Sequence, residues 1–316
     1  MHSSYPKRRR WLTVTGAALA ATLVLGACGG DGGSSSGTDS KKTDDTSKPV
    51  YGGKLTYALE AESADGWCLP EAQLAIAGIQ VARTIYDTLT APNAEGDYVP
   101  FLAEEVTPNT DFTEWTIKVR EGVKFHNGTA LDATVVKNNL DAYRGTYPAR
   151  NPLLFRFVYS NIKDVAVKDP LTVVVTMNGP WSAFPSALYG SGRIGMMAQE
   201  QLDDPETCDT KLIGTGPFSL VEWAQNDHLL TKKNPDYWGT DADGGQLPYL
   251  DELEYRPIIE ASSRTNALLG GDVNAIHTST PEQIDALRNA DSEGKVTNFE
   301  SDKFAETTFG QLNNSK

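Results

Sequence analysis

The sequence is poor in the residues that build metal and catalytic sites. Its 316 residues include only four histidines and three cysteines, and none of them lies at the spacing that a zinc site needs. The Gly-x-Ser-x-Gly pattern of a hydrolase is absent. The stretch Gly214-Thr215-Gly216 is followed by proline rather than lysine, so we interpret it as a backbone turn and not as a phosphate-binding loop. We therefore expect no metal, no cofactor and no catalytic residues.

Positive charge is also scarce. The chain has 28 lysine and arginine residues against 42 acidic residues, a formal net charge of −14. Proteins that bind nucleic acid neutralise phosphates with a basic surface, so nucleic acid is excluded as a partner. Paired carboxylates such as Glu104-Glu105 and Asp203-Asp204 are interpreted as the ordinary solvated surface of an acidic protein.

One long apolar run is present, and it lies at the N-terminus. Residues 7–10 are basic, the 17 residues 11–27 are uncharged, and Cys28 follows. This order is typical of a secretory signal, whereas a transmembrane anchor, the alternative, prefers about 20 apolar residues. Residues 25–28 (LGAC) resemble a bacterial lipobox, which implies that residues 1–28 are a lipoprotein signal peptide with the lipid attached to Cys28. The export route, Sec or Tat, stays open.

Residues 29–49 contain no large apolar side chain and cannot bury a core, so we expect a disordered tether. A Gly/Ser-rich coil of this length spans about 25 Å root-mean-square. If Cys28 is lipidated, Cys68 and Cys208 remain as an even pair in an oxidising compartment, and we predict a disulfide between them. Its loop of 140 residues would contribute roughly 5 kcal/mol. The alternative is two buried free thiols.

From Val50 onward, apolar spacing predicts a folded α+β or mixed α/β domain without internal repeats. Strands are expected at 51–59, at 115–125 as a meander, at 162–177 as a hairpin, and at 218–223 and 250–258. Helices are expected along the apolar stripe of 74–89, after the cap Asp132, at 263–269 before Gly270-Gly271, and from the capping box at 280–283.

Five stretches together point to one family. They are residues 98–105 (YVPFLAEE), 119–128 (VREGVKFHNG), 213–218 (IGTGPF), 233–238 (KNPDYW) and 247–253 (LPYLDEL). In this order they resemble the signature of solute-binding protein family 5. The family consists of extracytoplasmic receptors of ATP-binding cassette (ABC) importers for oligopeptides and dipeptides, with some members that take nickel chelates, haem or oligosaccharides.

The resemblance implies an α/β, periplasmic-binding-protein-like clamp of two lobes, type II-like, that closes by hinge bending around its ligand. Residues 50–274 would form lobe one, with a strand-rich inserted subdomain at about 79–200, and residues 275–316 would begin lobe two. The last residues, 312–316 (LNNSK), resemble the middle of a family motif. We therefore expect a fragment in which most of lobe two is missing.

The resemblance also implies where a ligand would contact the chain. In peptide-binding relatives an aspartate of lobe two pairs with the ligand's amine, and that residue would lie beyond Lys316. We expect Glu62 to pair a cationic group and Trp67 to stack on the ligand or fill a pocket; the alternatives are solvated carboxylates and a Trp67 packed beside Cys68. His126 and His277 are assigned no role. The ligand-binding candidates are Glu60, Glu62, Ser63, Trp67, Thr278 and Ser279.

The predicted function is that of a receptor rather than an enzyme. It would be anchored by Cys28 to the outer face of the cell membrane, capture a peptide, and deliver it to ABC permease and ATPase subunits for import. One alternative is a receptor of the same family for an oligosaccharide or a nickel chelate. Another is an extracytoplasmic sensor that docks to a signalling partner without transport.

Overall fold

The computed structural model describes residues 48–63 and 66–300. All of them belong to the second of two compact units, Lys48–Lys316. The predicted signal peptide, Cys28, residues 29–47 of the predicted tether, and the family-like stretch 312–316 lie outside the described residues.

A five-stranded mixed sheet has the strand order β11-β1-β10-β9-β8. The first strand, β1 (Lys54–Leu59), is parallel to both of its neighbours, β10 (Glu252–Pro257) and β11 (Ala275–Ile276). Strand β9 (His228–Lys233) pairs antiparallel with β10, and β8 (Phe218–Ala224) pairs antiparallel with β9. Because parallel strands run in the same direction, the carboxyl ends of β1, β10 and β11 meet at one edge of the sheet.

A second, antiparallel sheet has the order β4-β5-β7-β6. Helix α2 (Ala133–Arg144) contacts both β6 and β7. As predicted, Asp132 caps α2, and its Oδ1 accepts a hydrogen bond of 2.9 Å from the backbone N–H of Val135. The strands are β4 (Ala103–Pro108), β5 (Glu114–Val119), β6 (Ile162–Asp169) and β7 (Thr172–Met177). A separate hairpin joins β2 (Thr90–Pro92) to β3 (Tyr98–Pro100).

The predicted meander is wrong beyond β5. Val123 and Phe125 are buried, but between them the chain makes only an isolated bridge from Lys124 to Ala130. Strand β9 was not predicted, because His228 and the two lysines at 232–233 give its ends a polar character. These differences leave the strand-rich character of the middle section unchanged.

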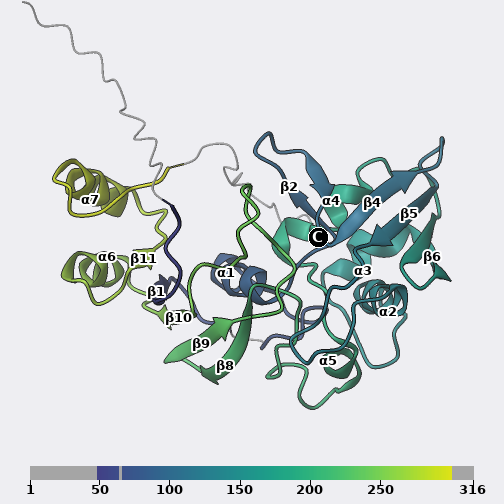
Figure 1. Cartoon of the computed structure of the whole chain (residues 1–316), viewed down its shortest axis with the longest axis horizontal. Helices are drawn as coiled ribbons and strands as arrows, with labels where there is room; N and C mark the ends of the chain where they lie inside the picture. Colours follow the sequence, from purple (N-terminus) through teal and green to yellow (C-terminus); the bar gives the residue numbers. More distant parts are fainter. Residues whose placement is uncertain (1–47, 64–65, 301–316) are drawn as a thin grey trace, which may run out of the picture. The chain divides into compact units, whose positions relative to one another are not determined.

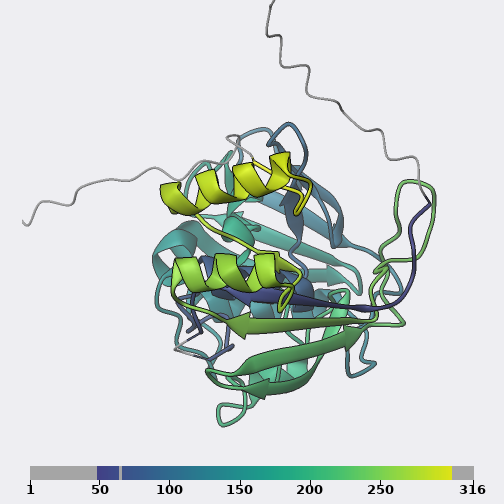
Figure 2. The same cartoon turned by 90° about the vertical axis from the view of Figure 1, so that its left-hand side faces the viewer.

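Helices α6 (Ala261–Gly270) and α7 (Pro281–Ser292) contact each other beside β11 (Figures 1 and 2). Gly271 ends α6 in the left-handed conformation at φ 81°, as its position predicts. Helix α7 begins at the predicted proline, but the Thr280 side chain accepts no capping hydrogen bond, so the predicted capping box is not formed. The other helices are α1 (Ile76–Ile85), α3 (Phe155–Val158), α4 (Phe184–Ala187) and α5 (Gln199–Asp203).

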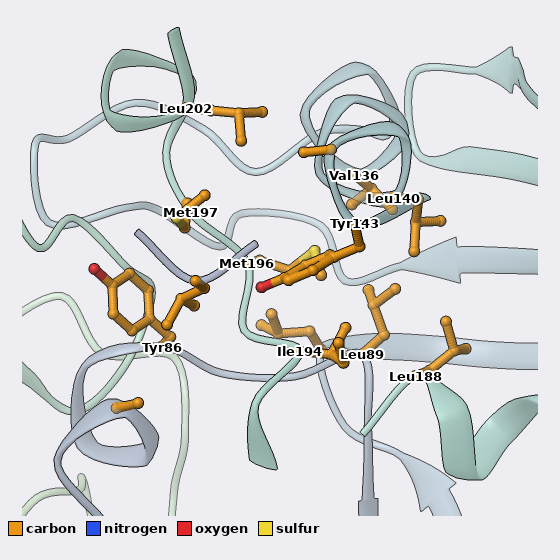
Figure 3. Packing of buried hydrophobic residues seen from close by; sticks show 14 of the residues in the cluster. Tyr86, Leu89, Val136, Leu140, Tyr143, Leu188, Ile194, Met196, Met197 and Leu202 are labelled. Atoms are coloured by element: carbon orange, nitrogen blue, oxygen red, sulfur yellow. The ribbon is translucent and has the colours of Figure 1, made fainter. Parts of the chain in front are cut away.

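One continuous core cluster joins the two sheets, and it extends from Leu59 on β1 to Tyr255 on β10. Figure 3 shows part of it, where Tyr143 of α2 extends toward Ile194 and Met196. The ring is fully buried, and its hydroxyl donates a hydrogen bond of 2.7 Å to the carbonyl of Gly195. A tyrosine can be buried in a core when its hydroxyl group finds a hydrogen-bond partner there. Among the described helices, none is both long and apolar enough to cross a bilayer.

Candidate functional site

Three chain segments leave the same edge of the five-stranded sheet. Glu60 directly follows β1, Ile258 directly follows β10, and His277 directly follows β11. Ligands of open α/β sheets bind outside the carboxyl ends of the strands. We therefore take this edge, which we call the β1/β10/β11 edge, as the candidate solute site.

The buried side chain of Arg264, on α6, connects these three segments. Its exposed fraction is only 3%, and a buried charge needs hydrogen-bond partners and a counter-charge. Nη1 donates to the carbonyls of Ile258 and Ile259 at 2.7 and 3.1 Å. Nε donates to the carbonyl of His277 at 3.1 Å, and Nη2 lies 3.7 Å from Oε2 of Glu60. The guanidinium therefore fixes the geometry of the edge.

Glu60 is held in place but stays accessible to water. Its other oxygen, Oε1, lies 3.3 Å from Nδ1 of His277, and the two side chains are 25% and 42% exposed. Burial, and next to it the charge of Glu60, raises the pKa of the neighbouring Tyr57. A fixed, partly exposed carboxylate can bind an ammonium or guanidinium group with a charge-assisted hydrogen bond.

Glu62 connects two segments of the backbone. Its Oε1 accepts from the backbone N–H of Ser63 at 2.9 Å, and its Oε2 accepts from the N–H of Asn226 at 3.0 Å. Asn226 lies in the β8–β9 turn with a φ of 64°. Both carboxylate oxygens of Glu62 thus already bind backbone donors. These contacts favour a structural role for Glu62 over the expected pairing with a cationic ligand.

Ser63 and Glu62 line a small cavity of about 120 Å³ at the start of α1. The Ser63 hydroxyl donates to the carbonyl of Gly66 at 2.9 Å and keeps its lone pairs as acceptors. The remaining lining residues are Ala61, Gln73, Leu74, Ala75, Ala77 and Gly78.

Trp67 is part of the core. Its exposed fraction is 1%, its ring packs edge-on against Trp223 with the centroids 5.8 Å apart, and its backbone N–H donates to the carbonyl of Asp209 at 3.1 Å. No face of the ring is open to a ligand. The expected stacking role is therefore wrong for this structure, and the packing alternative describes Trp67.

Cys68, the next residue, is bonded to Cys208 in a disulfide, the pair that the cysteine count predicts. Both cysteines are buried, and their Cα atoms lie 5.0 Å apart. Thr278 and Ser279 follow β11 and share the edge with Glu60. Thr278 is half-buried, its hydroxyl oxygen accepts from the N–H of Thr280 at 3.3 Å, and Ser279 is exposed.

The structure thus sorts the six candidates into three groups. Glu60, Thr278 and Ser279 lie at the β1/β10/β11 edge, Glu62 and Ser63 line the adjacent cavity, and Trp67 is in the core. Sequence reasoning missed two members of the edge, Arg264 and His277. Their partners lie up to about two hundred residues away, and the one available signal was the position of His277 directly after a strand.

Two of the family-like stretches, 213–218 and 233–238, meet at a different place, around the buried carboxylate of Asp87. This residue is 4% exposed, and its Oδ2 accepts from the Thr215 hydroxyl at 3.0 Å and from the indole N–H of Trp238 at 2.9 Å. Burial raises the pKa of Asp87 to about 6, against the opposing effect of these hydrogen bonds. The network joins residues from separate parts of the chain and is structural.

His126 joins the same network. Its Nδ1 accepts from the N–H of Gly214 at 3.3 Å, so its Nε2 carries the proton that is donated to the carbonyl of Gly216 at 2.9 Å. Burial lowers the pKa of His126, which keeps the ring neutral in this tautomer. Both glycines are required by close packing, because an added Cβ at Gly214 would lie 1.9 Å from the carbonyl oxygen of Ile85.

Within residues 48–63 and 66–300, no group of three or more His, Cys, Asp and Glu side chains is arranged to hold a metal ion. The functional groups at the described edge are the carboxylate of Glu60, the imidazole of His277 and the hydroxyl groups of Thr278 and Ser279.

Comparison with known proteins identifies the class of protein that this fold defines. The model of bacterial extracellular solute-binding proteins, family 5 (middle region), matches residues 97–316. The chain belongs to this family. The resemblance that the five sequence motifs carry is thereby confirmed.

Individual relatives agree with this assignment. The chain is 34% identical over 194 residues to the glutathione-binding protein GsiB of Escherichia coli (strain K12), which covers 61% of this chain and 36% of GsiB. The ABC transporter-associated periplasmic binding protein DppA of Helicobacter pylori, solved with the peptide STSA, matches at 24% identity and a TM-score of 0.65, covering 76% of this chain and 49% of that one. AgaA of A. tumefaciens R10, solved with agropinic acid, matches at 28% identity and a TM-score of 0.61, covering 70% and 43%.

These matches confirm the predicted α/β fold of the periplasmic-binding-protein type. The chain spans about a third of the length of GsiB and less than half of the two solved structures. The predicted boundaries at 50–274 and 275–316, with the inserted subdomain at about 79–200, stay predictions.

Proposed function

We propose that this chain forms part of an extracytoplasmic receptor that binds a peptide or peptide-like solute and delivers it to an ABC importer. The observation that carries the proposal is Glu60, a partly exposed carboxylate held by the buried Arg264 at the carboxyl ends of three parallel strands. Family membership supports the same reading, as do relatives named for binding glutathione and solved with a peptide.

The chemistry of the edge suits such a solute. The carboxylate of Glu60 would accept hydrogen bonds from the ammonium group of the solute, and Thr278 and Ser279 would bond its backbone amides. Glu60 also faces Arg264 and His277, so its affinity for a cation is moderated rather than maximal. This balance favours a zwitterionic solute over a purely cationic one.

We also propose the location. The basic and apolar N-terminal segment and the lipobox-like residues 25–28 support a lipid anchor on Cys28, outside the cytoplasmic membrane. Stable anchoring would follow from two or three acyl chains, since each buried CH₂ group contributes about 0.8 kcal/mol. The permease and ATPase subunits of an ABC importer would then be the partners.

Isothermal titration of the full-length protein tests the binding claim. The probes are trialanine, S-methylglutathione, the nickel complex of L-histidine and raffinose. We expect one of the two peptides to bind. We also expect Glu60→Gln to weaken that binding by about tenfold, because it removes one charge-assisted hydrogen bond.

The matched control is Glu105→Gln, which neutralises an exposed glutamate on β4, in the other sheet. Binding of raffinose or the nickel complex alone would replace the peptide reading with the oligosaccharide or chelate alternative. Binding of none of the four probes would contradict the proposed function and favour a sensor without a transported solute.

A further inference from the structure

We infer that the Cys68–Cys208 disulfide and Asp209 are positioning residues for the solute site. They hold the segment that follows β1 (residues 60–63 and 66–68) in its binding geometry before any solute arrives. The inference rests on the proposed function, since it concerns the segment that begins with Glu60. It gives the disulfide a role in affinity that is separate from its contribution to stability.

The first contact region lies between residues 66–68 and Asp209. The carbonyl oxygen of Asp209 accepts from the N–H of Trp67 at 3.1 Å, and its Oδ1 accepts from the N–H of Cys68 at 3.2 Å. Gly66 has a φ of 72°, and an added Cβ there would lie 2.6 Å from the Cβ of Asp209. The sequence thus places glycine where the two segments approach most closely, and the disulfide closes the same contact covalently.

The second contact region is the buried amide of Gln201. Its Nε2 donates to the carbonyl of Cys208 at 2.9 Å and lies 3.5 Å from the carbonyl of Trp67. Its Oε1 accepts from the N–H of Ile213 at 2.9 Å and from the hydroxyl of Tyr86 at 3.0 Å. One fully buried side chain therefore fixes the backbone on both sides of the disulfide to the core.

The restraint extends back toward Glu60. The Ser63 hydroxyl donates to the carbonyl of Gly66, and Glu62 joins the segment to the β8–β9 turn through Asn226. A segment that is ordered before binding loses less conformational freedom when the solute binds, which raises affinity. The disulfide and Asp209 thus restrain residues 66–68, and Glu62 restrains residues 62–63 of the same segment.

Hydrogen exchange measured by mass spectrometry, combined with titration, tests this inference on the full-length protein. The variants are Cys68→Ser/Cys208→Ser and Asp209→Ala, and the control is Asp111→Ala, in the β4–β5 turn. We expect at least tenfold faster exchange at the backbone amide of position 68 in both variants, and at position 67 in the double serine variant, because Asp209→Ala keeps the carbonyl that binds the Trp67 N–H. Exchange in β5 and β7 should stay unchanged, as should the control.

Affinity is measured with trialanine and S-methylglutathione, neither of which has a thiol that could reduce the disulfide. Both variants should bind the accepted probe about tenfold more weakly than the oxidised wild type does. If the double serine variant loses protection throughout, Asp209→Ala decides, because it keeps the disulfide.

Unchanged exchange at positions 67 and 68 would overturn the inference, and so would faster exchange with unchanged affinity. Failure of the oxidised wild type to bind either probe would instead contradict the proposed function. The two failures are therefore distinguishable.

Discussion

The substitution Asp87→Asn should make the protein progressively more stable than the wild type as the pH rises from 4 to 7. The hydrogen bonds from Thr215 and Trp238 end on the same oxygen, Oδ2, so the amide oxygen of asparagine can accept both in its place. The Tyr237 hydroxyl, which also bonds to the carboxylate, can accept from the amide N–H of asparagine instead. The substitution therefore removes the buried charge while it keeps the geometry of the network.

The magnitude follows from the pKa. The carboxyl group titrates near 3.8 in the unfolded chain, and burial raises its pKa in the folded state to about 6. Between these values the folded state binds more protons than the unfolded state, so wild-type stability falls as the pH rises through this window. A difference of about two pKa units corresponds to about 3 kcal/mol at 1.36 kcal/mol per unit.

The assay is urea denaturation of both proteins at pH 4, 5, 6 and 7. The difference in unfolding free energy, variant minus wild type, should increase by about 2 to 3 kcal/mol across the series. Taking the difference cancels the titration of His126, whose lowered pKa makes stability rise with pH in both proteins. A difference that is constant, or that decreases with pH, would refute the reasoning about Asp87.

Two further substitutions test the scaffold. Glu254→Gln, in β10, should destabilise the protein by about 1 to 3 kcal/mol at pH 7. Burial alone would raise the pKa of Glu254, but its ion pairs with Arg256 at 2.7 Å and Lys54 at 2.6 Å lower this pKa to about 2. Because the folded-state pKa is depressed, this effect should shrink as the pH falls from about 4.5 and vanish only near pH 2, and an effect independent of pH would contradict the ion-pair account. Gly214→Ala should reduce the free energy of unfolding by at least about 3 kcal/mol or prevent folding, because the added Cβ would overlap the backbone at Ile85. Gly122→Ala is the control: no atom lies within 4 Å of its added Cβ, so the substitution should cost only about 1 kcal/mol. Thermal melts of the two alanine variants make this comparison, and equal losses would contradict it.

Local signals in the sequence predicted the longer helices and many of the strands, but not β2, β3, β4, β9, β11 or the short helices α3, α4 and α5. Asp132 caps its helix, Gly271 ends another, and the turn at 168–170 marks a hairpin, because each of these effects depends on residues only a few positions apart. The five motifs identified the family for a different reason. Residues of two of them, Thr215 and Trp238, bond to the same buried carboxylate of Asp87, so their residue types are constrained together.

The candidate site was only partly predictable, because its contacts join distant parts of the chain. Trp67 looked available for a ligand, yet Trp223 covers it from β8. Arg264 lies in a predicted helix and had no predicted role, although its buried guanidinium contacts three separate segments. The spacing of residues along the sequence does not reveal such long-range contacts. They become visible only once the order of the strands in the sheet is known.

A crystal structure of the full-length protein with its bound solute tests the central claim most directly. The account predicts the cationic group of the solute within hydrogen-bond distance of the Glu60 carboxylate, with its backbone next to Thr278 and Ser279. A solute that is bound without contact to the β1/β10/β11 edge would contradict the account.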